Sequence, residues 1–278
     1  MMNKTIRGIL DIVLYIIVFL LIQMLTIYLF TTVDLLQQNA SWVVIGDTLA
    51  KGGIEMSGKM LVGTSVLSSI VTLVVFIYSK WATVSRVWLA SHPWVTLVWA
   101  ALLALGTILP SEWLLEALAF SMPESSIKMF ESIMSEPTGY LAIGILVPVA
   151  EELVFRGAVL RGLLRLFSDK WHWGAIVVSA VIFGAAHVNM AQFVHAFVMG
   201  LLIGWMYYRT SSIIPGILFH WVNNTVAYIM FHLMPQMADG KLIDLFHGDD
   251  RMLWMGIAFS FCIIIPSIFQ LHLRLRKE

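Results

Sequence analysis

Two adjacent glutamates, Glu151 and Glu152, lie in a stretch of the chain (138–160) that is otherwise apolar. A charged side chain in hydrocarbon costs at least ~2.5–3.5 kcal/mol and usually marks a functional site. Arg156 follows Glu152 by four residues, so the two share a helix face and are expected to form an ion pair. Glu151 points about 100° away and stays free to face a cavity, while Pro148 is expected to open or bend the helix. The alternative is that both glutamates belong to one structural ion network.

Two later apolar stretches carry histidine or asparagine at one-turn spacing. Phe183 and His187 share one helix face, and His220 and Asn224 share another. Polar groups of this kind inside a membrane are candidates for function. His195 lies between the two pairs in sequence, and for this lone histidine we favour a structural role.

One carboxylate, two histidines and an asparagine on three helices are sufficient to activate water for the hydrolysis of a peptide bond. In one scheme Glu151 acts directly as the general base on water. In the other, Glu151, His187 and His220 bind zinc and leave one position for water. The chain has no His-Glu-x-x-His motif, which is the strongest sequence sign of the zinc scheme. We therefore expect a site without metal or other cofactor, with zinc as the open alternative.

Glycines and a proline indicate where these helices start and where they approach one another. Gly200 and Gly204 form a small-xxx-small pair, which predicts close helix packing. Pro215 and Gly216 stand just before His220 and are expected to shape the first turn of its helix.

The composition places all of these residues in a membrane protein. Hydrophobic residues make up 59% of the 278 residues and charged residues 12%, and the mean hydropathy is +0.86. Soluble domains contain about 25% charged residues. The 17 basic and 17 acidic residues leave no net charge, so there is no electrostatic basis for a nucleic acid partner. The single cysteine, Cys262, excludes an intramolecular disulfide and a multi-cysteine metal site.

Apolar stretches of membrane-spanning length recur along the chain, with polar breaks between them. Each is continuously apolar rather than alternating, which favours helices over barrel strands. The chain is expected to form one membrane domain, 1–278, with the catalytic core at 138–232. We predict an all-α, polytopic integral membrane helical bundle with a membrane-embedded catalytic cavity and about eight spans. The predicted spans are 9–30, 60–79, 94–110, 138–160, 173–189, 191–208, 212–232 and 252–271.

Basic residues favour one side of the predicted bundle. They lie before the first span, in alternate connections and at the end of the chain: Lys4, Arg7, Lys80, Arg86, Arg161, Arg165, Lys170, Arg209, Arg274, Arg276 and Lys277. This pattern predicts an even number of helices with both termini cytoplasmic. The opposite connection, 111–137, is acidic, and either an interfacial amphipathic helix or a solvated loop fits it. The other long polar stretch, 31–59, is expected to be a flexible loop.

Taken in order, the three motifs resemble those of a known family of membrane enzymes. The motifs are Glu151-Glu152-x-x-x-Arg156, Phe183-x-x-x-His187 and His220-x-x-x-Asn224. Their order and spacing resemble the CPBP family (Abi, or CAAX protease and bacteriocin-processing) of intramembrane glutamic endopeptidases, and are similar to its CAAX prenyl protease 2 type. The resemblance implies that Glu152 and Arg156 orient the site.

The resemblance also implies a role for each of the other polar residues. Glu151 would be the general base on water, and His187 would help to hold or activate that water. His220 and Asn224 would donate hydrogen bonds to the tetrahedral oxyanion. The implied activity is hydrolysis of a peptide bond inside a membrane cavity, on a peptide or protein that is membrane-bound or lipidated.

The family's usual associations are bacteriocin immunity, peptide maturation and CAAX-type processing. For this chain we expect the plasma membrane of a bacterium as the location. Two other classes of function stay open. One is a non-catalytic membrane scaffold that regulates a partner such as a sensor kinase. The other is a transporter or proton relay that uses the same buried residues, although no inverted repeat supports a transporter.

Overall fold

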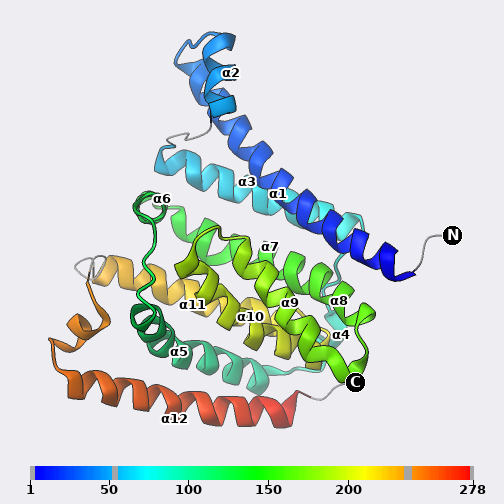
Figure 1. Ribbon diagram of the computed structural model, residues 1–278, viewed down its shortest axis with the longest axis vertical. Helices are drawn as coiled ribbons and strands as arrows, with labels where there is room; N and C mark the ends of the chain where they lie inside the picture. Colours follow the sequence, from blue (N-terminus) through cyan, green and yellow to red (C-terminus); the bar gives the residue numbers. More distant parts are fainter. Residues whose placement is uncertain (1–3, 52–55, 235–239, 276–278) are drawn as a thin grey trace.

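The computed structural model describes residues 4–51, 56–234 and 240–275, and every secondary-structure element in these ranges is a helix (Figure 1). The predicted all-α class is confirmed. The longer helices are α1 (Lys4–Gln37), α3 (Gly58–Tyr78), α5 (Trp94–Ala117), α10 (Met190–Thr210), α11 (Ile214–Leu233) and α12 (Asp250–Arg274). The shorter ones are α2 (Trp42–Lys51), α4 (Arg86–Ala90), α6 (Glu124–Met134), α7 (Val147–Val154), α8 (Arg161–Leu166) and α9 (His172–Ala185). Two π-helical segments, η1 (Tyr140–Leu146) and η2 (Phe155–Leu160), and two 3₁₀ turns, η3 (Asp169–Trp171) and η5 (Leu242–Phe246), complete the described elements.

Five helices in the described ranges, α1, α3, α5, α10 and α12, are long and apolar enough to span a bilayer. The chain is therefore a multi-pass membrane protein. The other three predicted spans do not reach the helix length or the hydropathy of a membrane span, each for a physical reason. α9 has 14 residues and is about 21 Å long, whereas the hydrocarbon core is about 30 Å thick. α11 contains two histidines and two asparagines, and the helix that carries the paired glutamates is interrupted by η1 and η2. The count of eight spans stays a prediction.

The helices that carry the predicted site residues form the centre of the bundle. α1 packs against α3 on one side, and α12 packs against α5 on the other, with α7, α9, α10 and α11 between these pairs (Figure 1). α10 is the most enclosed candidate span, because 44% of its most apolar window is buried, against 22–33% in the other four. Large apolar side chains on the outer helices are exposed, such as Leu25, Leu29, Phe259 and Phe269. In a membrane these side chains face lipid.

Glycines allow α9 and α10 to approach closely, as the Gly200–Gly204 pair predicted. A Cβ atom at Gly200 would lie 2.9 Å from the Cβ of Ala180, and one at Gly204 would lie 2.9 Å from Cγ2 of Ile176. Larger residues at these positions would push the two helices apart.

Two connections contain helices. The flexible loop expected at 31–59 is wrong for most of its described part, because α1 continues to Gln37 and α2 covers Trp42–Lys51. Residues 52–55 of this stretch lie outside the described residues. The hydroxyl of Ser41 accepts a hydrogen bond from the N–H of Val44 over 3.4 Å, which starts α2. In 111–137 the helical alternative is the one observed, since α6 is a helix with Ile133 buried on one face.

The two ends of the described chain lie at the same end of the bundle (Figure 1). Gly8 of α1 packs on Leu166 at the end of α8. The basic residues of α1 and those of α8 therefore lie at this same end of the bundle. This is the arrangement that an even number of crossings requires. Arg276 and Lys277 lie outside the described residues, and the side of the membrane stays a prediction.

Candidate active site

The paired glutamates lie in α7, between the π-helical segments η1 and η2 of one helix that runs from Tyr140 to Leu166. Pro148 removes one regular backbone bond where the first segment ends, because it has no N–H and its ring clashes with the carbonyl four residues earlier. The helix widens here, and the N–H of Val147 bonds to the carbonyl of Ala142, five residues back. Segments of this kind are frequent at functional sites. The sequence predicted a distortion at Pro148, but not a π segment on each side of the glutamates.

Glu152 and Arg156 form a buried ion pair. Nη1 of Arg156 donates to Oε1 of Glu152 over 2.7 Å, and the two side chains are 1% and 0% exposed. This is the pair that their four-residue spacing predicted. The ring of Phe183, from α9, covers the guanidinium, whose Cζ lies 4.4 Å from the ring centroid. Such a cation–π contact stabilises a desolvated cation, and it ties the glutamate-bearing helix to α9.

Phe183 also contacts both predicted catalytic histidines. Its ring centroid lies 5.3 Å from that of His187 and 6.0 Å from that of His220, with the rings nearly perpendicular in both pairs. It also packs against Phe155, with the ring centroids 4.9 Å apart. The sequence marked Phe183 only as the partner of His187, since contacts with other helices leave no local signal.

His220 lies between the two glutamates. Its Nδ1 is 3.3 Å from Oε1 of Glu152, and its Nε2 is 3.8 Å from Oε2 of Glu151. Because a carboxylate only accepts, Nδ1 carries a proton and donates a hydrogen bond to Glu152. The ion pair of Glu152 and Arg156 therefore also fixes the imidazole ring of His220.

Glu151 is held more loosely than its neighbour. Its side chain is 17% exposed, and the 3.8 Å separation from His220 is longer than a hydrogen bond. Its carboxylate forms no shorter polar contact with any residue that the structure describes. Helical phase explains the contrast, because adjacent residues face directions about 100° apart. The lone pairs of Glu151 are available to another molecule.

His187 lies in the turn after α9, which corrects the span predicted at 173–189. The helix stops two residues earlier because the chain reverses toward α10: Val188 adopts a left-handed φ of 61°, and Asn189 caps α10. His187 and Phe183 still face each other, but across a turn rather than along a regular helix.

The proton of His187 is placed by a local hydrogen bond. Its Nδ1 lies 3.0 Å from the carbonyl oxygen of Phe183. Since a carbonyl only accepts, Nδ1 carries the proton, and Nε2 keeps a lone pair in the neutral ring. No hydrogen bond or ion pair joins His187 to Glu151 among the described residues.

Asn224 and its neighbour Asn223 bond to different elements. Nδ2 of Asn224 donates to the carbonyl of Ile143 in η1 over 2.8 Å. Oδ1 of Asn223 accepts from Nε2 of His195 over 3.1 Å, which joins α11 to α10. His195 thus has a helix-bridging partner, in line with the structural role that we favoured for it.

Gly216 is a site residue to which the sequence assigned no contact with the glutamates. A Cβ atom there would lie 2.7 Å from Oε2 of Glu152, so glycine allows α11 to approach the buried carboxylate. The sequence feature that could have revealed this role is the four-residue spacing, which places Gly216 on the same helix face as His220 and Asn224. Pro215 occupies the first turn of α11, as predicted.

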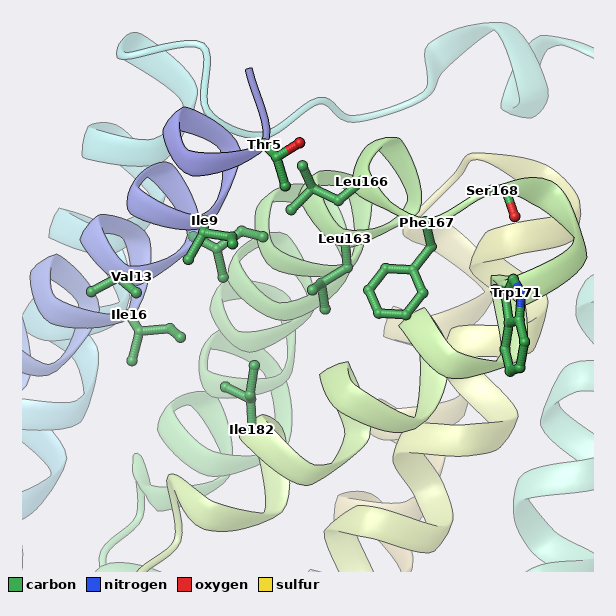
Figure 2. Close-up of a pocket in the computed structure, with 11 residues that line it drawn as sticks. Thr5, Ile9, Val13, Ile16, Leu163, Leu166, Phe167, Ser168, Trp171 and Ile182 are labelled. Carbon is green, nitrogen blue, oxygen red and sulfur yellow. The ribbon is translucent and has the colours of Figure 1, made fainter. Parts of the chain in front are cut away.

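Two cavities differ in their relation to these residues. A cavity of 510 Å³ lies on the side of the bundle between α1 and the segment from α8 to α9, and Figure 2 shows that mostly aliphatic side chains line it. It contains no titratable lining residue and lies away from the glutamates. A cavity of 200 Å³ adjoins the turn of His187, and its lining residues are Gly184, Ala185, Val188, Asn189, Met190 and Phe193. His187 itself is not among the residues that line this cavity.

Metal binding would need several donors that point at one place. Among the described residues, no three His, Cys, Asp or Glu side chains are placed to hold a metal ion. The set Glu151, His187 and His220 of the zinc scheme does not converge in this arrangement. The expectation of a metal-free site stays a prediction.

Comparison with known proteins gives a match that contains all three motifs. Residues 134–226 match the family model of Rce1-like type II CAAX prenyl endopeptidases, which confirms the resemblance for this part of the chain. A curated relative, "Putative membrane peptidase YdiL" of Bacillus subtilis (strain 168), is 27% identical over 107 residues. That match covers 38% of this chain and 43% of the length of YdiL. No solved structure matches the chain.

Proposed function

We propose that this chain is an endopeptidase that hydrolyses a peptide bond within the membrane, using water activated by Glu151. The similarity of residues 134–226 to Rce1-like endopeptidases supports the reaction class. The observation that carries the proposal is the contrast between adjacent glutamates. Glu152 is buried in an ion pair, whereas Glu151 is partly exposed and lacks a hydrogen bond in the described part of the chain.

Glu151 acts as the general base in this proposal. It takes a proton from a water molecule, and the resulting hydroxide adds to the carbonyl carbon of the scissile bond. The tetrahedral intermediate then breaks its C–N bond, and the leaving nitrogen takes the proton from Glu151. A residue in this role must accept and release a proton, which an unpaired carboxylate does more readily than one that is neutralised by arginine.

His187 orients the water. Because its Nδ1–H is bonded to the carbonyl of Phe183, the Nε2 lone pair is available to accept a hydrogen bond from water. The ring of Phe183, 5.3 Å away, limits rotation of the imidazole. We place the entry of water at the cavity of 200 Å³ beside this turn.

His220 and Asn224 stabilise the oxyanion. His220 needs a proton on Nε2 for this task in addition to the one that Nδ1 donates to Glu152 over 3.3 Å. Because Glu152 is already paired with Arg156, the negative oxyanion itself balances the charge of the imidazolium. Asn224 has two N–H groups, of which one is bonded to Ile143 and the other is left to donate. The loss of one such donor typically costs about 2.7–4 kcal/mol in the transition state.

The substrate is a peptide or protein that reaches the site from the membrane. Lipidated C-terminal tails are one class, by similarity to prenyl endopeptidases, and membrane-bound peptides in maturation or bacteriocin immunity are another. We place the protein in a bacterial plasma membrane, with both termini cytoplasmic.

Replacement of Glu151 tests the proposal against a non-catalytic scaffold. Glu151→Gln keeps the shape of the side chain and removes the base, so cleavage and any cellular phenotype that depends on it should be lost at unchanged abundance in the membrane. Glu124→Gln removes an exposed carboxylate of α6 and should retain both. A phenotype that survives intact in a stably expressed Glu151→Gln variant would assign that function to a scaffold.

We also propose that the reaction needs no metal, because no described donor set converges on one point and the chain lacks a His-Glu-x-x-His motif. Cleavage by the purified protein should survive treatment with a chelator. Loss of cleavage that added zinc restores would establish the zinc scheme instead.

A further inference from the structure

One carbonyl in η1 lacks the donor that its own helix would supply. At the end of this segment the N–H of Val147 bonds to the carbonyl of Ala142, five residues back. The next N–H in the series would bond to the carbonyl of Ile143, but it would belong to Pro148, which has none. An unpaired backbone carbonyl inside a membrane protein is unfavourable. Ile143 therefore needs a donor from elsewhere.

Asn224 of α11 supplies that donor. Its Nδ2 lies 2.8 Å from the carbonyl oxygen of Ile143, although 81 residues separate the two in sequence. A neutral amide has two N–H groups, so this bond uses one of them and fixes the direction of the other. The same side chain thus pairs the backbone of η1 and, in the proposed reaction, has one N–H left for the oxyanion.

Other side chains join the far end of η1 to α11. Nε1 of Trp221 donates to the hydroxyl of Tyr140 over 3.0 Å, and that hydroxyl lies 2.9 Å from Oγ1 of Thr225. Gly144 leaves room for the ring of Tyr140, since a Cβ atom there would lie 2.5 Å from it. These contacts hold the start of η1, and Asn224 holds the part nearer the glutamates.

We propose that Asn224 is a positioning residue that replaces the N–H missing at Pro148 and keeps η1 in its π-helical form. A π turn contains about one residue more than an α turn. Reversion of η1 to α-helical geometry would therefore rotate α7 by about 100° relative to the preceding chain. Glu151, three residues after Pro148, would turn away from His220. The consequence for catalysis rests on the proposed endopeptidase activity, whereas the structural role does not.

A double-mutant cycle between Pro148 and Asn224 tests the structural role without an assay of activity. Asn224→Ala leaves the carbonyl of Ile143 unpaired, and we expect the Tm of the purified protein in detergent to fall by several degrees. Pro148→Ala supplies an N–H five residues after Ile143, which a π turn can use, so Asn224→Ala should lower Tm much less in that background. Equal falls in the two backgrounds would overturn the proposal. If Asn224→Ala alone does not fold, recovery of a folded double variant is the expected result, and failure of both overturns it.

Asn223→Ala is the matched control. Asn223 is the same residue type one position earlier, but it bonds to His195 of α10 rather than to η1. Pro148→Ala should therefore leave the effect of Asn223→Ala on Tm unchanged. Equal rescue of both asparagine variants would show a general stabilisation by Pro148→Ala and would overturn the specific link.

Cleavage of a membrane-anchored peptide in liposomes tests whether Asn224 positions Glu151 through η1 or acts only by direct contact with the oxyanion. We expect Asn224→Ala to lower kcat with little change in KM, and Pro148→Ala to restore part of that loss. Recovery of Tm without any recovery of kcat would overturn the positioning role in catalysis. If the wild-type protein cleaves no peptide, the proposed function fails, while the Tm cycle still decides whether Asn224 replaces the missing N–H.

Discussion

Glu151 and Glu152 are neighbours in the chain, yet the first is 17% exposed and the second is completely buried. A buried carboxylate is stable only when it is paired, and Glu152 contacts both Arg156 and His220. The contact with Arg156 was predictable, because it joins residues four apart on one helix. The contact with His220 joins residues 68 apart and depends on where α11 packs, so no pattern within one helix could predict it.

Breaking this buried pair should cost far more stability than breaking an exposed pair of the same spacing. Glu152→Gln leaves the buried guanidinium of Arg156 without its counter-ion and should lower the free energy of unfolding by about 3–5 kcal/mol. Glu124→Gln is the matched control, because Glu124 and Lys128 are also four residues apart and 2.7 Å from each other, but 81% and 69% exposed. Its effect should stay below about 1 kcal/mol. Thermal unfolding in detergent compares the two variants, and equal losses would contradict the burial of Glu152.

At the level of the elements, contacts between helices determine where the regular α-helix is interrupted. Each π-helical segment has a carbonyl that bonds to a side chain of another helix: Asn224 donates to Ile143 of η1, and Ser179 of α9 donates to Phe155 of η2. Apolar periodicity and Pro148 predicted the helix and a distortion in it. They could not predict the widened segments or the end of α9, because the partners that stabilise them become adjacent only after packing.

The approach of α9 to α10 gives a second prediction. A Cβ atom at Gly200 would lie 2.9 Å from Cβ and 3.0 Å from Cα of Ala180, and such contacts with the backbone are relieved only if α9 moves. Gly200→Ala should lower the free energy of unfolding by about 1–3 kcal/mol, and it should slow cleavage because α9 positions Phe183. Gly46→Ala in α2, with nothing within 4 Å of its Cβ, should be neutral or slightly stabilising. An unchanged Tm in Gly200→Ala would mean that α9 and α10 lie farther apart than described.

For the whole molecule, composition was sufficient to predict a helical membrane protein, but not the number of spans. The segments that carry the site least resemble ordinary spans, because histidine, asparagine and glutamate lower their hydropathy and interruptions shorten their regular helices. The five helices that are both long enough and apolar enough to span a bilayer are mostly outer ones, with α10 as the exception. The polar residues that the proposed function needs are therefore the same residues that make these segments hard to recognise as membrane spans.

Labelling of single cysteines tests the predicted orientation. Cys262 is the only cysteine, so Cys262→Ser provides a background without thiols. In that background Lys4→Cys and Lys170→Cys should react with an impermeant maleimide from the cytoplasmic side, and Glu124→Cys from the opposite side. Intact cells and inverted vesicles give the two sides. Reaction of all three variants from one side would contradict the predicted topology.

Cleavage by the purified protein in liposomes tests the role of Glu151 most directly. Wild-type protein and Glu151→Gln are incubated with a library of membrane-anchored peptides, lipidated ones included, and new termini are identified by mass spectrometry. We expect the wild-type protein to cleave at least one peptide and Glu151→Gln to cleave it about 10²–10⁴-fold more slowly, with an unchanged Tm. Cleavage by Glu151→Gln at the wild-type rate would contradict the assignment of Glu151 as the general base.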